Sequence, residues 1–201
     1  MLIYDETFVA TMDATRDEAT ALGTDAYGSE HLLLGLLTAA DDLTRRVVEE
    51  FPGLTPSVVR DAVRDAADDA PHLARLGLTA PPAPATDATR RAAPPRVKHR
   101  PELQAALNRA TAAWGHLRKA HALPKERRLS SAVLWLAVLE PSARAPRLLD
   151  ALGIDPDAVR TAVLRTLVPA GTPAPTWPTD PPVGPVTRLA HRIFGRTHVA
   201  R

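Results

Sequence analysis

The stretch GSEHLLLGLL at residues 28–37 constrains the fold more than any other part of this chain. Its leucines leave no polar face for water, which is typical of a helix buried on most sides. Ser29 is expected to be the N-cap of this helix, and Glu30 suits the positive end of the helix dipole. Gly35 is expected to let a neighbouring helix come close. The first half of the chain is therefore predicted to form around this helix.

Composition narrows the possible classes of protein. Hydrophobic residues make up 45% of the chain but aromatic residues only 4%, so the core must be aliphatic. Without cysteine there are no disulfides and no cysteine-ligated metal, which favours a reducing compartment. No apolar run approaches the ~20 residues of a membrane span, and the N-terminus lacks a signal-peptide pattern. We therefore expect a cytoplasmic protein for which membrane binding is unlikely. The net charge of +2 gives no reason to expect nucleic-acid binding.

Helical periodicity appears twice, on either side of a proline-rich stretch. Apolar side chains recur at helical spacing in four segments before residue 69 and again in the second half, where residues 130–139 form a second buried helix. The sequence GLTPSVVRDAV at 53–63 recurs as GIDPDAVRTAV at 153–163, with an offset of 100 residues. This internal duplication predicts two repeats of four helices each, each around its own aliphatic core.

The fold class predicted is thus all-α, with two pseudo-symmetric four-helix repeats, a proline-rich linker and a C-terminal tail. In the tail, apolar residues lie on one helical face and arginines on the others, which predicts a short basic amphipathic segment. The predicted domains are repeat 1 at 1–69, the Pro/Ala-rich linker at 70–98, the degenerate repeat 2 at 99–168 and the tail at 169–201.

The segment from Tyr4 to Val63 resembles one repeat of the N-terminal domain of Clp-type AAA+ unfoldases. Tyr4 matches the aromatic residue of the family pattern, and residues 28–37 match its Gly-Thr-Glu-His-Leu-Leu-Leu-Gly-Leu signature almost letter for letter. The tandem arrangement is also that of the family, so the resemblance covers about residues 1–168. A Gly-x-x-x-x-Gly-Lys-Ser/Thr phosphate loop is absent from the chain, so we do not expect ATP hydrolysis. The resemblance implies a stand-alone form without the ATPase modules.

The resemblance also implies a place for ligands, in the groove between the first helices of the two repeats, where cyclic peptides lodge in the family. Met1 and His99 replace the aromatic residues of the family groove, so the ligand is expected to differ from the usual ones. The groove residues expected by position are Met1, Met12, Arg16, His99, Gln104, Leu107 and Asn108.

In some members each repeat also binds phosphoarginine, through the threonine after the aromatic residue and the signature glutamate. Glu30 is present here, but Asp5 replaces the threonine. A carboxylate repels a phosphate. Asp5 and Glu30 are the candidate residues of such a site. Arg100 and Ala132 stand at the corresponding positions of the second half.

Three functions stay open. The first is a non-catalytic binding module that recognises Clp substrates or adaptors or regulates a Clp chaperone-protease. The second is sequestration of a cyclic peptide antibiotic, a self-resistance role. The third is binding of membrane or nucleic acid through the basic tail. No catalytic residue, cofactor or metal site is predicted, because the spacing of the histidines and serines matches no such motif. Partners are expected to be a Clp unfoldase, its substrates or adaptors, or a cyclic peptide; the chain itself is expected to be a monomer or a weak dimer.

Overall fold

The computed structural model describes residues 3–67, 98–120, 128–169 and 171. Nearly all of the predicted linker and tail, including the basic segment from residue 186, lies outside these residues, as does Met1. The described part is helical, which confirms the all-α prediction. Its helices are α1 (Glu6–Ala21), α2 (Ser29–Ala39), α3 (Asp42–Glu50), α4 (Pro56–Ala67), α6 (Pro101–Ala120), α7 (Ser131–Val138), α8 (Ala145–Ala151) and α9 (Pro156–Leu167). Its strands are β1 (Ile3–Tyr4), β2 (Ala26–Tyr27), β3 (Lys98–His99) and β4 (Arg128–Leu129).

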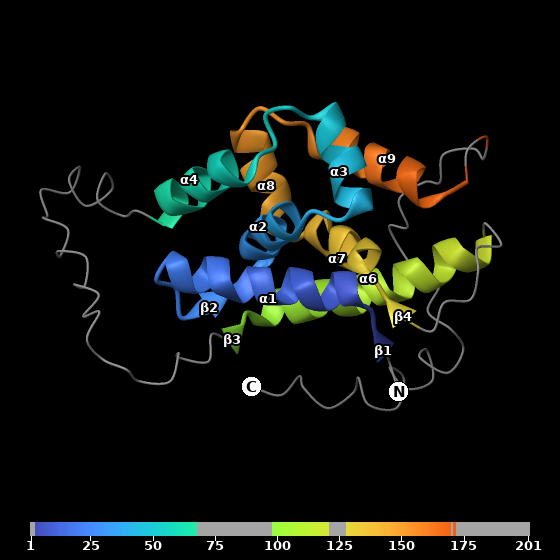
Figure 1. Cartoon of the computed structure of the whole chain (residues 1–201), viewed down its shortest axis with the longest axis horizontal. Coiled ribbons are helices and arrows are strands. Elements are labelled where there is room, and N and C mark those ends of the chain that lie inside the picture. The colour runs from blue at the N-terminus through green and yellow to red at the C-terminus, as the bar shows by residue number, and fades with distance from the viewer. Residues whose placement is uncertain (1–2, 68–97, 121–127, 170, 172–201) are drawn as a thin grey trace, which may run out of the picture.

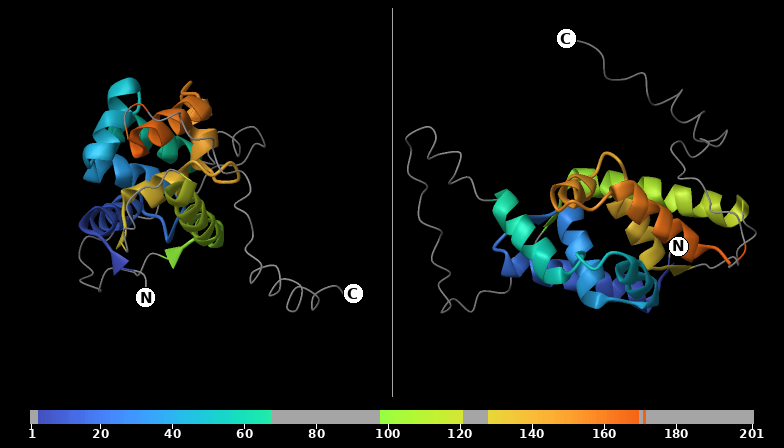
Figure 2. Two further views of the ribbon diagram at one scale, coloured as in Figure 1. Left: turned by 90° about the vertical axis from the view of Figure 1, so that its right-hand side faces the viewer. Right: turned by 90° about the horizontal axis from the view of Figure 1, so that it is seen from above.

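The helices form three layers (Figure 1). The long helices α1 and α6 make one outer layer, α2 and α7 lie in the middle, and α3, α4, α8 and α9 cover the other side. The same order is visible when the molecule is turned by 90° (Figure 2). The middle layer is the most apolar, because α2 and α7 have a neighbouring helix on every side.

The middle helices are buried as the leucine-rich stretch predicts. Nine consecutive residues of α2, 29–37, are buried, and so is every residue of α7. The expectation of two separate cores is wrong. Buried residues from both halves form one cluster, because α2 packs directly against α7. Trp135 of α7 lies in this cluster, and its Nε1 donates a hydrogen bond to Thr44 Oγ1 of α3 over 3.0 Å.

The short strands also join the two halves. β1 pairs in parallel with β4, and β2 pairs in parallel with β3. Each described strand of the first half therefore pairs with a strand of the second half, and no pair within one half occurs among the described residues. The backbone hydrogen bond from Asp5 N to Leu129 O and the one from Arg100 N to Tyr27 O extend these pairings into α1 and α6. The pairing of β2 with β3 thus joins the segment after α1 to the start of α6, and the pairing of β1 with β4 joins the start of α1 to the start of α7.

Ser29 does not have its predicted role. The N-cap of α2 is Gly28, and Ser29 is the first residue of the helix. The Ser29 hydroxyl instead accepts hydrogen bonds from the backbone N–H groups of Arg144 and Ala145, at 2.9 and 3.1 Å. It thereby satisfies free donors at the start of α8. In the other half Ser131 donates to Asp41, the N-cap of α3. Each middle helix therefore supports the start of a helix from the other half.

A buried ion pair links α1 and α4. Glu18 is 7% exposed and accepts two hydrogen bonds from Arg60, at 2.6 and 2.9 Å, and one from Thr38 at 2.9 Å. The bonds from Arg60 lower the pKa of Glu18 below its ordinary value, and they outweigh the burial that acts in the opposite direction. The carboxylate therefore stabilises the fold only while it is ionised.

We expect Glu18→Gln to lower the free energy of unfolding at pH 7 by about 1–3 kcal/mol, the range for a hydrogen bond to a charged group. Because the folded-state pKa is lowered, this stabilisation is complete above the pKa of the unfolded chain and is lost as the pH falls through the folded-state pKa. Urea unfolding between pH 3 and 7 should show the difference between variant and wild type shrinking on the acid side. Glu50→Gln is the control, since its partner Arg165 is exposed. Equal effects of the two changes would contradict this account of Glu18.

Candidate ligand-binding groove

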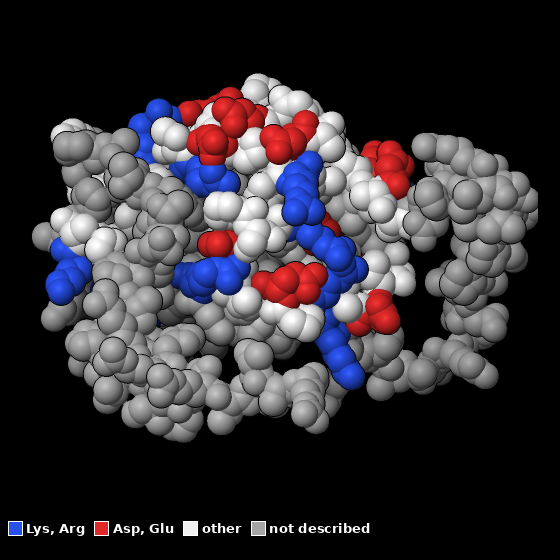
Figure 3. Space-filling view, turned by 180° about the vertical axis from the view of Figure 1, so that it is seen from behind, with Lys and Arg blue, Asp and Glu red and all other residues white. Residues whose placement is uncertain are grey.

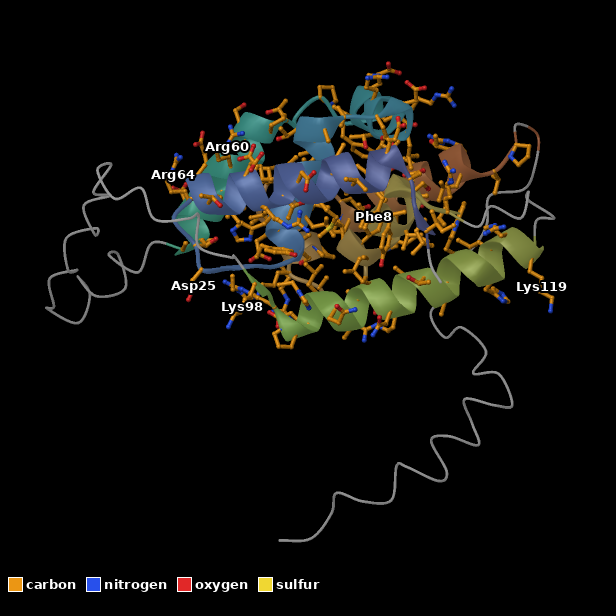
Figure 4. The ribbon with its side chains drawn as sticks, turned by 60° about the horizontal axis from the view of Figure 1, so that its bottom comes forward. Phe8, Asp25, Arg60, Arg64, Lys98 and Lys119 are labelled. Carbon is orange, nitrogen blue, oxygen red and sulfur yellow. The ribbon has the colours of Figure 1, made fainter. Side chains whose placement is uncertain are left out.

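A groove of about 430 Å³ runs between α1 and α6. Figure 4 looks onto this side of the molecule, with α1 above, α6 below and Phe8 on the α1 wall. The groove exists because the strand pairs hold α1 beside the starts of α6 and α7, while α2 and α7 fill the space beneath the groove. Its lining residues are Tyr4, Phe8, Val9, Met12, Asp13, Arg16, Tyr27, His99, Gln104, Leu107, Asn108, Thr111, Leu129 and Val133.

The groove holds most of the residues that the sequence placed there. The structure brings six of the seven to its walls, and the seventh, Met1, lies outside the described residues. The six are Met12, Arg16, His99, Gln104, Leu107 and Asn108. The structure shows that these six side chains line one groove. Binding of a ligand by them stays a prediction.

Aromatic side chains line the groove more fully than the sequence suggested. Tyr4 and Phe8 stack with ring centroids 4.4 Å apart. Tyr27 belongs to the buried core with 5% exposure, and it also lines the groove, where its ring lies 6.3 Å from the His99 ring. The described part of the groove therefore offers aromatic surface from residues other than those at the Met1 and His99 positions. Tyr4 and Tyr27 were missed because they lie in β1 and β2, and two-residue strands leave no periodic signal. Phe8 lies on α1, one turn before Met12.

The rim of the groove is polar. Gln104 Nε2 donates to Asn108 Oδ1 over 3.1 Å along α6, and Arg16 pairs with Asp13 over 2.6 Å along α1. These side chains are held by neighbours on their own helices, and they remain exposed. An apolar floor with amide and charged groups along its edges suits an extended peptide, whose side chains enter the floor while its backbone meets the rim.

Glu30 lies in a different cavity, of about 720 Å³, between α2, α4 and α8. Its Oε1 is 3.7 Å from Arg100 Nη1 and 3.9 Å from Arg144 Nη1. Its Oε2 is buried and accepts no hydrogen bond within the described part of the chain. Arg64 and Arg147 line the same cavity. The cavity thus offers one carboxylate surrounded by guanidinium groups.

The Glu30 carboxylate is held ionised. Burial raises the pKa of Glu30, but the neighbouring His31 side chain, the Glu30 backbone N–H and Arg100 together outweigh burial and leave the pKa below its ordinary value. The carboxylate also packs closely over Gly28, where a Cβ would lie 2.5 Å from Oε2. His31 beside it is buried, and its Nδ1 accepts the Gly28 N–H over 3.3 Å.

Asp5 and Glu30 are not brought together. Asp5 is the N-cap of α1, and its carboxylate accepts from Phe8 N and Thr7 Oγ1. It lines a third cavity, of about 390 Å³, together with Ala132. The four candidate positions therefore lie in two cavities, each with one residue from either half of the chain. Glu30 lies near Arg100, and Asp5 shares a cavity with Ala132. Repulsion from Asp5 does not act on a ligand at Glu30.

Charge on the surface is mixed. On the face shown in Figure 3, basic and acidic side chains lie next to one another and form no broad surface of one sign. Within the described ranges no cluster of three metal-ligating side chains occurs, and no helix has the length and apolar character needed to cross a bilayer.

The fold is also found among proteins of known structure. The fold is similar to the crystal structure of the N-terminal domain of the caseinolytic protease associated chaperone ClpD from Arabidopsis thaliana, with a TM-score of 0.56 and 19% identity. The match covers 82% of this chain and 94% of the ClpD domain. No protein-family model matches the sequence, and no curated protein matches it either.

Proposed function

The fold is that of a Clp N-terminal domain, and from it we propose that this protein is a non-catalytic module that binds peptide segments of Clp substrates or adaptors. The observation that carries the proposal is the α1–α6 groove, in which an apolar, partly aromatic floor meets a polar rim. Phe8, Met12 and Leu107 supply the floor. Methionine adapts its shape to varied apolar side chains, which suits a receptor for many sequences.

Casein is a suitable probe, because the chaperone with the similar fold is named as associated with a caseinolytic protease. We expect fluorescein-labelled casein to bind the full chain and Met12→Glu to weaken binding at least about tenfold, or about 1.4 kcal/mol. The physical reason is that an apolar ligand side chain would have to desolvate the new carboxylate. Fluorescence anisotropy gives the dissociation constants.

Exposed valines provide a matched control. Val9 on the groove and Val58 on α4 are 48% and 39% exposed, so glutamate at either position leaves the core intact. Val9→Glu should weaken casein binding and Val58→Glu should not. Equal affinity of Met12→Glu, Val9→Glu and wild type would contradict the proposed groove.

Sequestration of a cyclic peptide is the alternative ligand for the same groove. The stacked rings of Tyr4 and Phe8 favour it, since a preorganised ring loses little conformational entropy when it binds rigid aromatic walls. Calorimetry with an aromatic peptide in its cyclic and linear forms distinguishes the two functions. Strong preference for the cyclic form supports sequestration, and equal affinity supports recognition of peptide segments.

The Glu30 cavity supports a second binding chemistry. Glu30 is placed to accept a ligand guanidinium in a planar fork, while Arg100 and Arg144 are placed to attract a phosphate. This combination fits a phosphorylated arginine side chain. Free phosphoarginine should therefore bind the full chain and lose affinity in Glu30→Gln, whereas arginine and inorganic phosphate alone should bind weakly. Binding of inorganic phosphate as tight as that of phosphoarginine would contradict a role for Glu30.

A further inference from the structure

The strand β1 and the first turn of α1 expose apolar side chains that no described segment covers. Ile3, Tyr4 and Val9 are 46%, 50% and 48% exposed and stand among the few large exposed hydrophobic residues of the described chain. Next to them lies an open depression of about 400 Å³, which we call the α1 rim. It is lined by Tyr4, Asp5, Glu6, Val9, Ala10 and Asp13.

The α1 rim is acidic. Asp5, Glu6 and Asp13 line it, and neither lysine nor arginine contributes to that lining. Glu6 and Asp13 are exposed. An apolar patch bordered by carboxylates is complementary to a segment with an apolar face and basic flanks. It is unsuited to an anionic membrane surface, which the carboxylates would repel.

The chain itself provides such a segment close by. Val186, Leu189, Ile193 and Phe194 recur at helical spacing, and Arg188, Arg192 and Arg196 fall between them. The described chain ends beside the start of α1, because Thr166 and Leu167 of α9 line the same cavity as Asp5 and Thr7. From residue 171 to residue 186 an extended chain reaches about 50 Å, which is long enough to bring residue 186 to the start of α1.

We propose that residues 186–196 dock on the α1 rim of their own chain. The apolar residues of the segment meet Tyr4 and Val9, and its arginines pair with Glu6 and, in exchange for Arg16, with Asp13. Because Tyr4, Val9 and Asp13 also line the α1–α6 groove, the docked segment occupies one end of that groove and competes with external peptides. The interaction is independent of which external ligand the groove takes.

The test uses the full chain, which has no cysteine and therefore accepts a single spin label. A nitroxide on Gly195→Cys should broaden the NMR amide signals of residues 4–13 far more than those of α4. Glu6→Lys/Asp13→Lys should abolish this selective broadening. Adding Arg188→Glu/Arg192→Glu/Arg196→Glu to that variant should restore it, because the charges are then exchanged.

Asp61→Lys/Asp65→Lys on α4 is the matched control, since Asp61 pairs with Arg64 three residues on as Asp13 pairs with Arg16. This control should leave the broadening unchanged. Broadening that is uniform, or that survives Glu6→Lys/Asp13→Lys, overturns the proposal. So does broadening of an isotope-labelled chain by a spin-labelled second copy, which would assign the α1 rim to self-association. If the labelled segment partitions into anionic vesicles while the amide signals of α1 stay unchanged, the segment binds membrane. That result would likewise overturn docking on the α1 rim.

Discussion

Gly35→Ala is expected to lower the free energy of unfolding by about 3 kcal/mol, the upper end for overpacking. A Cβ at this position would lie 2.1 Å from Thr15 Oγ1, 2.7 Å from the Thr11 carbonyl oxygen and 2.8 Å from Thr15 N. Two of these atoms belong to the backbone of α1, so they can yield only if the whole helix moves. The better helix propensity of alanine offsets about 1 kcal/mol at most. Urea unfolding followed by circular dichroism measures the change.

Gly115→Ala is the matched control. Gly115 also lies inside a helix, α6, but it is exposed and a Cβ there would meet nothing within 4 Å. Without a clash only the propensity term acts, and the control should be more stable than wild type by up to about 1 kcal/mol. If Gly35→Ala were as stable as Gly115→Ala, the close approach of α1 to α2 would be wrong.

Trp135→Ala is expected to lower the free energy of unfolding by about 4 kcal/mol. The side chain is fully buried in the core that both halves share, so its removal leaves a cavity. The change also removes the hydrogen bond from Nε1 to Thr44 Oγ1, and Thr44 is itself buried. Thermal and urea unfolding should both show the loss.

Phenylalanine substitutions separate the hydrogen bond from the packing. Trp114 is also buried, but its Nε1 has no hydrogen-bond partner in the described structure. Trp135→Phe should therefore be more destabilising than Trp114→Phe by about 1 kcal/mol, the value of one hydrogen bond. Equal effects would mean that the bond between α7 and α3 contributes nothing.

Periodicity predicted the helices well, because their burial follows from local sequence. The apolar stretch at 28–37 predicted α2, and the recurring segments at 53–63 and 153–163 contain the starts of α4 and α9 at Pro56 and Pro156. The close approach at Gly35 was also predicted, since a glycine in so apolar a helix has few other reasons to be there. The tandem repeat itself stays a prediction.

Contacts between the halves were not predicted. Ser29 looked like a local cap, yet its partners lie 115 and 116 residues away. The single core and the proximity of Glu30 to Arg100 were missed for the same reason, because they too depend on contacts between residues far apart in the sequence. Periodicity describes which face of an element is buried, but it carries no information about which distant element covers that face. The groove residues were placed by family resemblance, and those supplied by strand pairing were missed.

The central claim is that the α1–α6 groove holds the ligand, and NMR mapping of the full chain with bound casein peptide tests it most directly. The account predicts shifted amide signals at Phe8, Met12, Gln104 and Leu107, with unchanged signals around the exposed Val58 on α4, in the layer on the other side of the molecule. Shifts confined to α3 and α9, with the groove signals unmoved, would contradict it.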